Sequence, residues 1–438
     1  MTPLTHRRVL NIALPIVLSN ATVPLLGLVD TGVVGQLGQP APIGAVGIGA
    51  VILTSVYWIF GFLRMGTSGL VAQSHGAGDG AQVGAHLLRA LTIGAAAGLA
   101  FVVMQLPIFW AAFRLAPASP EVEVLARQYL TIRIWGAPAT IALYAITGWL
   151  IAIERTRAVL ALQVLQNGLN VVLDLWFVLG LSMGVAGVAW ATLIAEWSGL
   201  ALGLFFARHA LRAAIAATRG MAKLFARDQL DRLLRVNGDI MIRSVLLQAS
   251  FTSFLFLGAA QGDVTLAANQ VLLQFLSITA FALDGFAFAA ESLVGQAVGA
   301  RRPDQVRRAA ILTSQWGLGG AVVLGLVFWF GGGAIIDILT TAPEVRSEAR
   351  HYLIWLGAAP VIGIASWMFD GIFIGATLTR EMRMAMLQSV TLYVLAVVIL
   401  PLLWGNDGLW AALMVLNTAR GLTMWRLYPR AETAAQPA

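Results

Sequence analysis

Long apolar runs, separated by short polar segments, follow one another along the whole chain. About 20 apolar residues cross the hydrocarbon core of a bilayer as a helix, so each run predicts a membrane-spanning helix. Some runs are longer than a span needs, which implies that these helices tilt or extend into water. The predicted spans are 9–36, 43–74, 88–113, 122–153, 159–182, 186–208, 232–260, 265–298, 309–332, 345–376, 384–404 and 408–427.

Composition agrees with a membrane protein. Hydrophobic residues make up 59% of the 438 positions and charged residues only 11%, whereas a soluble domain carries about 25% charged residues. The chain has no cysteine, which excludes disulfides and thiolate metal sites. We therefore expect an all-α protein that crosses the membrane many times.

The positions of the basic residues predict the orientation of the chain. Cytoplasmic loops of membrane proteins carry an excess of Lys and Arg. With both termini cytoplasmic, most of the 28 basic residues fall on the cytoplasmic side. They are Arg7, Arg8, Arg89, Arg155, Arg157, Arg301, Arg302, Arg307, Arg308, Arg380, Arg383, Arg426, Arg430 and the cations between Arg208 and Arg235. The net charge of +7 therefore needs no nucleic acid, and we expect a multi-pass protein of the cytoplasmic (inner) membrane.

An internal repeat divides the chain in two. GLVAQSHGAGDGAQV from Gly69 matches SLVGQAVGARRPDQV from Ser292, and PEVEVLARQYL from Pro120 matches PEVRSEARHYL from Pro343, both at a shift of 223 residues. Two matches at one offset predict two six-helix lobes with the same orientation in the membrane. We place the N-terminal lobe at 1–208, a cytoplasmic linker at 209–231 and the C-terminal lobe at 232–438. Such a pair of lobes is the arrangement of secondary transporters that work by alternating access.

Three segments give a specific resemblance. PIVLSNATVPLLGLVDTGVVGQLG at 15–38, GFAFAAESLVGQAVGARR at 285–302 and WMFDGIFIGATLTREMR at 367–383 resemble the DinF-like branch of the multidrug and toxic compound extrusion (MATE) family. The resemblance implies a V-shaped transporter with twelve helices in two lobes. It also implies an antiporter that couples entry of H⁺ or Na⁺ to export of organic, cationic or amphipathic compounds.

Polar residues inside spans are candidates for function, because burying them in a bilayer is costly. Gln163, Asn167, Asn170 and Asp174 recur at helical spacing and share one face of a span. The resemblance implies that Asp30, Asn170, Asp174 and Thr192 hold the coupling cation. Carboxylate, amide and hydroxyl oxygens suit this task, since they bind a proton or a hard cation such as Na⁺. The alternative for these residues is a set of hydrogen bonds that only pack helices together.

A second polar line lies in the predicted C-terminal lobe. Gln270, Gln274, Ser277, Asp284 and Glu291 extend along one predicted helix, and Asp370 is a further acid in this lobe. A line of this length must face protein or water. We interpret Gln270, Gln274, Asp284, Glu291 and Asp370, with Asn167 of the other lobe, as groups that bind substrate or relay protons. The alternative is that the acids are buried in ion pairs with Arg243 or Arg420.

The sequence also suggests two other functions. GTSG at 66–69 matches the motif of rhomboid-type serine proteases, but the histidines all fall near predicted helix ends, so no base is available for the serine. We therefore expect no enzyme, no catalytic residues and no cofactor beyond H⁺ or Na⁺ as coupling ion. A lipid-linked precursor flippase of the same superfamily is the closer alternative, although the acidic character of the deep residues favours cationic cargo. We expect a monomer in the lipid bilayer, whereas the choice of coupling ion, the exported compounds and the roles of Arg64, Arg243 and Arg420 stay open.

Overall fold

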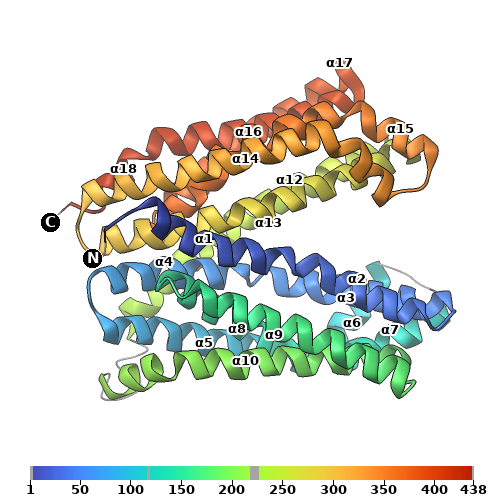
Figure 1. The fold of residues 1–438 in the computed structure, drawn as a ribbon, viewed down its shortest axis with the longest axis horizontal. Coiled ribbons are helices and arrows are strands. Elements are labelled where there is room, and N and C mark those ends of the chain that lie inside the picture. The colour runs from blue at the N-terminus through green and yellow to red at the C-terminus, as the bar shows by residue number, and fades with distance from the viewer. Residues whose placement is uncertain (1–2, 116–118, 218–225, 437–438) are drawn as a thin grey trace. The chain divides into compact units, whose positions relative to one another are not determined.

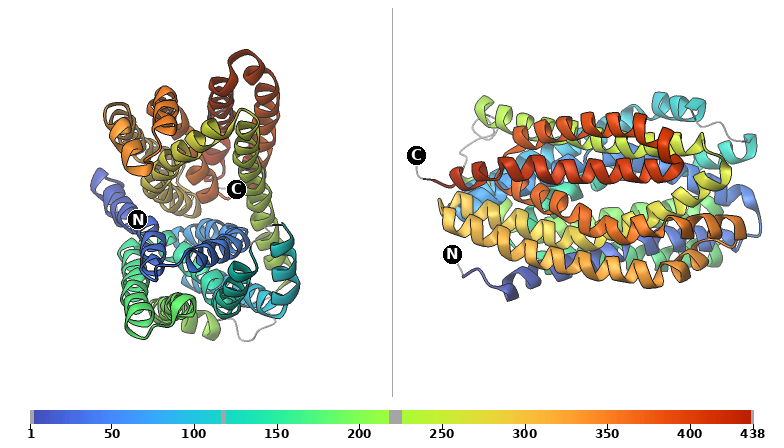
Figure 2. Two further views of the ribbon diagram at one scale, coloured as in Figure 1. Left: turned by 90° about the vertical axis from the view of Figure 1, so that its right-hand side faces the viewer. Right: turned by 90° about the horizontal axis from the view of Figure 1, so that it is seen from above.

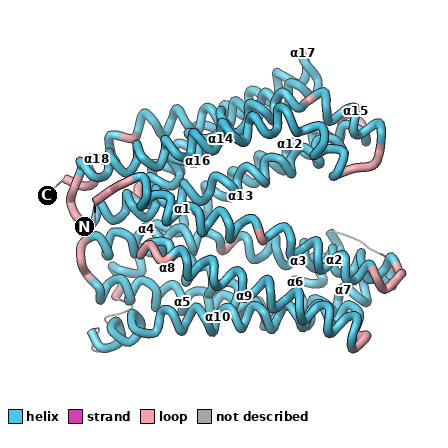
Figure 3. The backbone as a smooth tube through the Cα atoms, in the orientation of Figure 1, coloured by secondary structure: helices cyan, strands magenta, loops and turns pink. Residues whose placement is uncertain are grey.

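The computed structural model describes residues 3–115, 119–217 and 226–436. In these ranges the backbone is almost entirely helical and contains no β-strand (Figures 1 and 3). The all-α prediction is confirmed.

The helices follow the apolar runs, several of which are interrupted by short breaks. In chain order they are α1 (His6–Ala21), α2 (Val23–Gly35), α3 (Pro40–Trp58), α4 (Gly61–Gly76), α5 (Gly80–Val103), α6 (Gln105–Leu115), α7 (Pro120–Arg133), the 3₁₀ turn η1 (Ile134–Gly136), α8 (Ala137–Ala152), α9 (Thr156–Asp174), the π-helical turn η2 (Leu175–Gly180), α10 (Gly184–Ala217), α12 (Arg227–Ala259), α13 (Asp263–Gly299), α14 (Pro303–Leu339), α15 (Pro343–His351), α16 (Leu353–Gly375), α17 (Thr379–Leu427) and α18 (Pro429–Thr433).

The surface of these helices is suited to lipid. Ten helical segments of the described chain are long and apolar enough to cross a membrane. Leu402, Ile338 and Phe330 leave more than four fifths of their surface exposed, which in water would cost the free energy of hydrating large apolar side chains. The pair α1–α2, which is interrupted at Thr22, and a second arm of α17 complete the twelve predicted spans.

Helix α17 is two antiparallel arms joined by a sharp turn. Gly405 has φ 56° and ψ −129°, a conformation that side chains rarely allow. The hydroxyl groups of Ser389 and Thr423, one from each arm, lie 3.4 Å apart. The two arms therefore lie side by side, as Figure 2 shows in red.

The chain forms two compact units. Unit 2 contains Leu18–Val71 and Asp79–Arg232, and its core gathers side chains of α2, α3, α6, α7 and α10 around Tyr57, Tyr129 and Leu130. Unit 1 contains Leu233–Ala438 together with Met1–Val17 and Ala72–Gly78, and its core is centred on Phe254, Phe275 and Trp410. The predicted lobes differ from these units in that two short N-terminal segments, 1–17 and 72–78, group with unit 1.

The repeat is visible in the positions where helices begin and end. Helix α4 ends at Gly76 and α13 at Gly299, α7 begins at Pro120 and α15 at Pro343, and α9 begins at Thr156 and α17 at Thr379. Backbone conformation follows the same shift, because Glu154 (φ 60°) corresponds to Thr377 (φ 53°) and Ser182 (φ 54°) to Gly405 (φ 56°). Each pair is separated by the 223 residues found in the sequence, and the predicted repeat is confirmed.

Two glycines related by the repeat pack reciprocally inside unit 1. A Cβ atom on Gly76 would collide with the backbone carbonyl of Gln296, and one on Gly299 would collide with that of Gln73. The Gln73 side chain adds hydrogen bonds from Nε2 to the Gly375 carbonyl oxygen (3.1 Å) and to Thr377 Oγ1 (3.0 Å). These positions accept no side chain, because the atoms in the way are backbone.

Replacing Gly299 with alanine is expected to lower the melting temperature of the purified protein. The added side chain meets main-chain atoms that cannot rotate away, and overpacking of this kind costs about 1–3 kcal/mol or more. Gly319→Ala in α14 is the matched control, because a Cβ there has no atom within 4 Å. Equal melting temperatures for the two variants would show that the contact at Gly299 is not close.

Candidate functional site

The interruption between α1 and α2 shapes the region of Asp30. Pro24 stands in the first turn of α2, where its missing N–H leaves the helical hydrogen-bond ladder incomplete. Asn167 of α9 stabilises this break, since its Nδ2 donates to Thr22 Oγ1 (2.7 Å) and to the Thr22 carbonyl oxygen (3.2 Å). Gln163 Nε2 in turn donates to Asn167 Oδ1 (3.1 Å). A predicted substrate or relay residue, Asn167, thus also fixes the start of the helix that carries Asp30.

Asp174 lies where the helical geometry changes. It is the last residue of α9, and the π-helical turn Leu175–Gly180 follows directly. Such wide turns are rare and occur mostly at functional sites. Across from it, α10 presents Thr192, whose Oγ1 lies 3.0 Å from the Val188 carbonyl oxygen.

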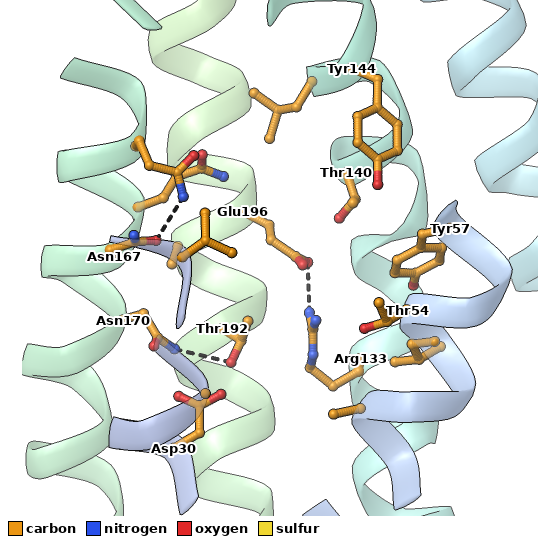
Figure 4. A pocket seen from close by; sticks show the side chains of 18 of the residues that line it. Asp30, Thr54, Tyr57, Arg133, Thr140, Tyr144, Asn167, Asn170, Thr192 and Glu196 are labelled. Atoms are coloured by element: carbon orange, nitrogen blue, oxygen red, sulfur yellow. Dashed lines mark hydrogen bonds and ion pairs between the residues drawn. The ribbon is translucent and has the colours of Figure 1, made fainter. Parts of the chain in front are cut away.

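The structure brings Asp30, Asn170, Asp174 and Thr192 together. When the Asn170 amide nitrogen is turned toward the two acids, it lies 3.1 Å from Asp30 Oδ1 and 3.2 Å from Asp174 Oδ2. The amide oxygen then accepts from Thr192 Oγ1 at 3.0 Å. In this orientation each of the three Asn170 contacts joins a donor to an acceptor. Asn170 therefore bridges both carboxyl groups, and Figure 4 shows Asp30 directly below it.

This cluster is shielded from solvent. Asp174 is fully buried, Asn170 is 1% exposed and Thr192 is 7% exposed, whereas Asp30 is half-buried. Asp174 Oδ1 has no hydrogen-bond partner among the described residues. A buried carboxylate oxygen without a partner is costly, and a proton or a small cation beside it would remove that cost. The cluster can therefore accept a cation.

The cluster opens into a cavity of about 390 Å³ within unit 2. Asp30, Asn167, Asn170 and Thr192 line it, together with a group of residues that the sequence analysis did not assign to a site. These additional residues are Thr54, Tyr57, Tyr129, Arg133, Thr140, Tyr144 and Glu196. In this group Arg133 Nη1 donates to Glu196 Oε2 at 2.7 Å. The available signal was that both are ionisable residues within predicted spans, but sequence alone does not show that they pair.

The predicted C-terminal polar line is not gathered into one site. Along α13 its exposure changes from Gln270 and Gln274, which are exposed, through half-buried Asp284 to Glu291, which is 1% exposed. None of these four side chains lines the Asp30 cavity. Their role in binding substrate or relaying protons stays a prediction.

Asp370 lies in a buried ion-pair triad, which is the alternative considered for the acids of this lobe. Arg243 Nη2 and Arg420 Nη2 both donate to Asp370 Oδ2, the latter at 2.7 Å. Arg420 also donates to Asn417 Oδ1 at 3.2 Å. A carboxylate held by two guanidinium groups is not available to attract a cation, so a structural role fits Asp370 better than substrate binding, and the same contacts account for Arg243 and Arg420.

The second repeat lacks an equivalent of the acidic cluster. At the 223-residue shift Asp30 corresponds to Ser253 and Asn170 to Tyr393. These two side chains also meet, with Ser253 Oγ 2.9 Å from Tyr393 Oη, and Tyr393 donates to the Ser250 carbonyl oxygen at 3.0 Å. The contact between the two helices is retained, but a hydroxyl group stands in place of the Asp30 carboxylate, and Val397 stands in place of Asp174.

Comparison with known proteins relates the whole chain to one group. The MatE family model matches residues 15–176 and 240–402. The chain is 41% identical to DNA damage-inducible protein F of Escherichia coli, over 96% of this chain and 91% of that protein. It is 28% identical to a probable multidrug resistance protein NorM of Pseudomonas aeruginosa, over 97% and 91%. A solved outward-facing structure of a multidrug resistance MATE family transporter superposes with a TM-score of 0.88 at 18% identity, over 99% of this chain and 97% of that one.

Proposed function

The chain belongs to the MatE family of membrane transporters, and on that premise we propose that it is a secondary antiporter for organic compounds. It exports cationic or amphipathic molecules by alternating access and is driven by entry of H⁺, Na⁺ or both. Asp30, Asn170, Asp174 and Thr192 form the site of the coupling cation.

One observation carries this proposal: two carboxyl groups, joined by one amide, share a buried site in which an oxygen has no partner. Two carboxylates that contact the same amide lie close enough to repel each other, and burial increases this repulsion. Within this cluster, Asp174 Oδ1 has no hydrogen-bond partner among the described residues. A single positive charge at this place would reduce both the repulsion and the cost of burial.

Asn170 gives the site two arrangements. With its nitrogen toward Asp30 and Asp174 it compensates the two acids in the absence of a cation. With its oxygen toward them it would complete the oxygen shell that a hard cation requires. Rotation of this one amide would thus change the site from one in which the amide nitrogen contacts both acids to one in which an additional oxygen faces a cation. Because Asn167 of the same helix bonds to Thr22 at the start of α2, movement of either helix would alter the position of Asp30.

The proposed setting is the cytoplasmic membrane, crossed many times with both termini inside. The distribution of Lys and Arg along the sequence supports this orientation. The proposed partners are small organic substrates, the coupling cation and lipid. A lipid-linked precursor flippase finds no support in the relatives reported above, whose names describe DNA damage induction and multidrug resistance.

The experiment that tests the function is efflux from proteoliposomes that contain the purified protein and a fluorescent cationic dye. Imposed pH and Na⁺ gradients, applied separately, are each expected to drive efflux if the corresponding ion couples. At least one gradient must accelerate efflux above that of liposomes without protein. Failure of both gradients, with protein shown to be folded and inserted, would contradict cation-coupled export.

A further inference from the structure

The cavity next to the cation cluster contains polar groups that the coupling site does not use. Its lining residues include two acids, Asp30 and Glu196, but only one basic residue, Arg133. The cavity is of the size that small ligands occupy, which starts at about 300 Å³. An acidic excess in the lining of a cavity favours a cationic ligand.

One carboxylate oxygen of Glu196 is held in an ion pair, and the other is free to bind a ligand. Its Oε2 accepts from Arg133 Nη1 at 2.7 Å, and both side chains keep about a tenth of their surface exposed. Arg133 is fixed from its other side by Tyr129, whose hydroxyl accepts from Arg133 Nε at 3.4 Å. The structure gives no hydrogen bond to Glu196 Oε1 from the described residues, so this oxygen can accept from a ligand.

Two hydroxyl groups in the cavity wall have no hydrogen-bond partner among the described residues, Tyr57 Oη and Thr140 Oγ1. Tyr57 is only 4% exposed, so its hydroxyl has little access to water. Figure 4 shows Tyr144, Thr140 and Tyr57 one above another, across from Glu196. Buried polar atoms without partners are uncommon in native proteins and require an explanation. A ligand that donates hydrogen bonds would supply one.

We propose that Glu196, Tyr57 and Thr140 form a subsite for a protonated amine of the exported compound. The ammonium group donates N–H hydrogen bonds to Glu196 Oε1 and to the two hydroxyl oxygens, while Arg133 holds the carboxylate in position. This inference rests on the proposed export of organic cations and adds a rule of selectivity to it. Amines that carry N–H groups bind in preference to quaternary ammonium ions, which have the same charge but no donor.

The aromatic wall makes this rule testable, because it favours the opposite outcome. Tyr57, Tyr129 and Tyr144 line the cavity, and aromatic faces attract quaternary ammonium ions through cation–π contact. Recognition by hydrogen bonds and recognition by ring faces thus predict opposite orders of affinity for two otherwise matched cations.

The experiment compares benzylamine, which is protonated at neutral pH and then carries three N–H donors, with benzyltrimethylammonium. Binding of each is measured by calorimetry on the purified full-length protein in lipid nanodiscs. The wild-type protein is expected to bind the protonated amine about tenfold more tightly than the quaternary ion, because only the amine can donate a hydrogen bond to the charged Glu196 carboxylate. Tyr57→Phe and Thr140→Val are each expected to move this ratio toward one. Their melting temperatures should stay equal or rise, because each removes a buried hydroxyl without a partner.

Thr131→Val is the matched control, since the Thr131 hydroxyl is bonded to the Arg127 carbonyl oxygen on an exposed face of α7. Its affinity ratio should equal that of the wild-type protein. Equal affinities for the two ligands, a preference for the quaternary ion, or an unchanged ratio in both cavity variants would each overturn the subsite. Because binding is measured without a gradient, these outcomes are independent of whether the protein exports its substrates by cation coupling.

Discussion

Asp30→Asn is expected to abolish gradient-driven efflux while the protein still inserts and folds. The variant keeps the size and a hydrogen-bonding group of the side chain but removes one of the two charges that would hold the cation. Loss of a charge-assisted contact of about 1.5–3 kcal/mol lowers cation affinity by at least about tenfold. Proteoliposome efflux under an imposed gradient measures the effect, and a normal melting temperature serves as the control for folding. Efflux at the wild-type rate would remove Asp30 from the coupling site.

A double-mutant cycle with Asp174→Asn tests whether the two acids act as one site. Asn170 contacts both carboxyl groups, so the effects on cation affinity are expected to be strongly non-additive. The second substitution should cost little once the first has been made. Additive losses would mean that Asp30 and Asp174 bind cations independently.

Asp370→Ala is expected to have the largest effect on stability. It would leave the guanidinium groups of Arg243 and Arg420 buried without their shared carboxylate. Breaking a buried ion pair by removal of one partner costs about 3–5 kcal/mol. We expect a large drop in melting temperature and in the yield of monodisperse protein, as measured by thermal unfolding and size-exclusion chromatography.

The triple variant Arg243→Met, Asp370→Met and Arg420→Met separates the structural role from proton relay. Methionine side chains already surround this triad, at Met382, Met386 and Met424, and replacing a complete buried ion pair by apolar residues is often neutral or stabilising. Recovery of stability together with gradient-driven efflux would exclude Asp370 from the relay. Recovery of stability with efflux lost would instead support the relay that the sequence suggested.

Much of the fold follows from the sequence because lipid imposes a simple rule on it. Each span needs a long apolar run, and the duplication repeats these runs at a fixed distance, so Pro120 and Pro343 both begin helices. Breaks within spans were harder to predict. The turn at Gly405 follows from the sequence only as the gap between two apolar runs, and the interruption at Thr22 falls inside the single predicted span 9–36.

The site was predictable where residue type carries the information. An acid in an apolar span is conspicuous, and helical spacing places Asn170 and Asp174 on one face. Residue type and helical spacing do not predict which side chains from distant segments pair with each other. Nothing in the sequence shows that Arg133 meets Glu196 rather than Asp30, or that Asp370 is shared by two arginines, because these contacts depend on how helices pack.

The loss of the acidic pair from the second repeat, where Ser253 stands for Asp30 and Val397 for Asp174, bears on the energetics of the proposed transport. Had duplication kept both copies of the acidic site, each cycle would have carried twice as many ions, and a given gradient could have concentrated the substrate further. Losing one copy reduces that thermodynamic ceiling but leaves a cycle that consumes fewer ions for each molecule expelled. In the proposed antiporter the single acidic cluster would thus set the exchange ratio, because the equivalent positions in the second half of the chain carry no charge.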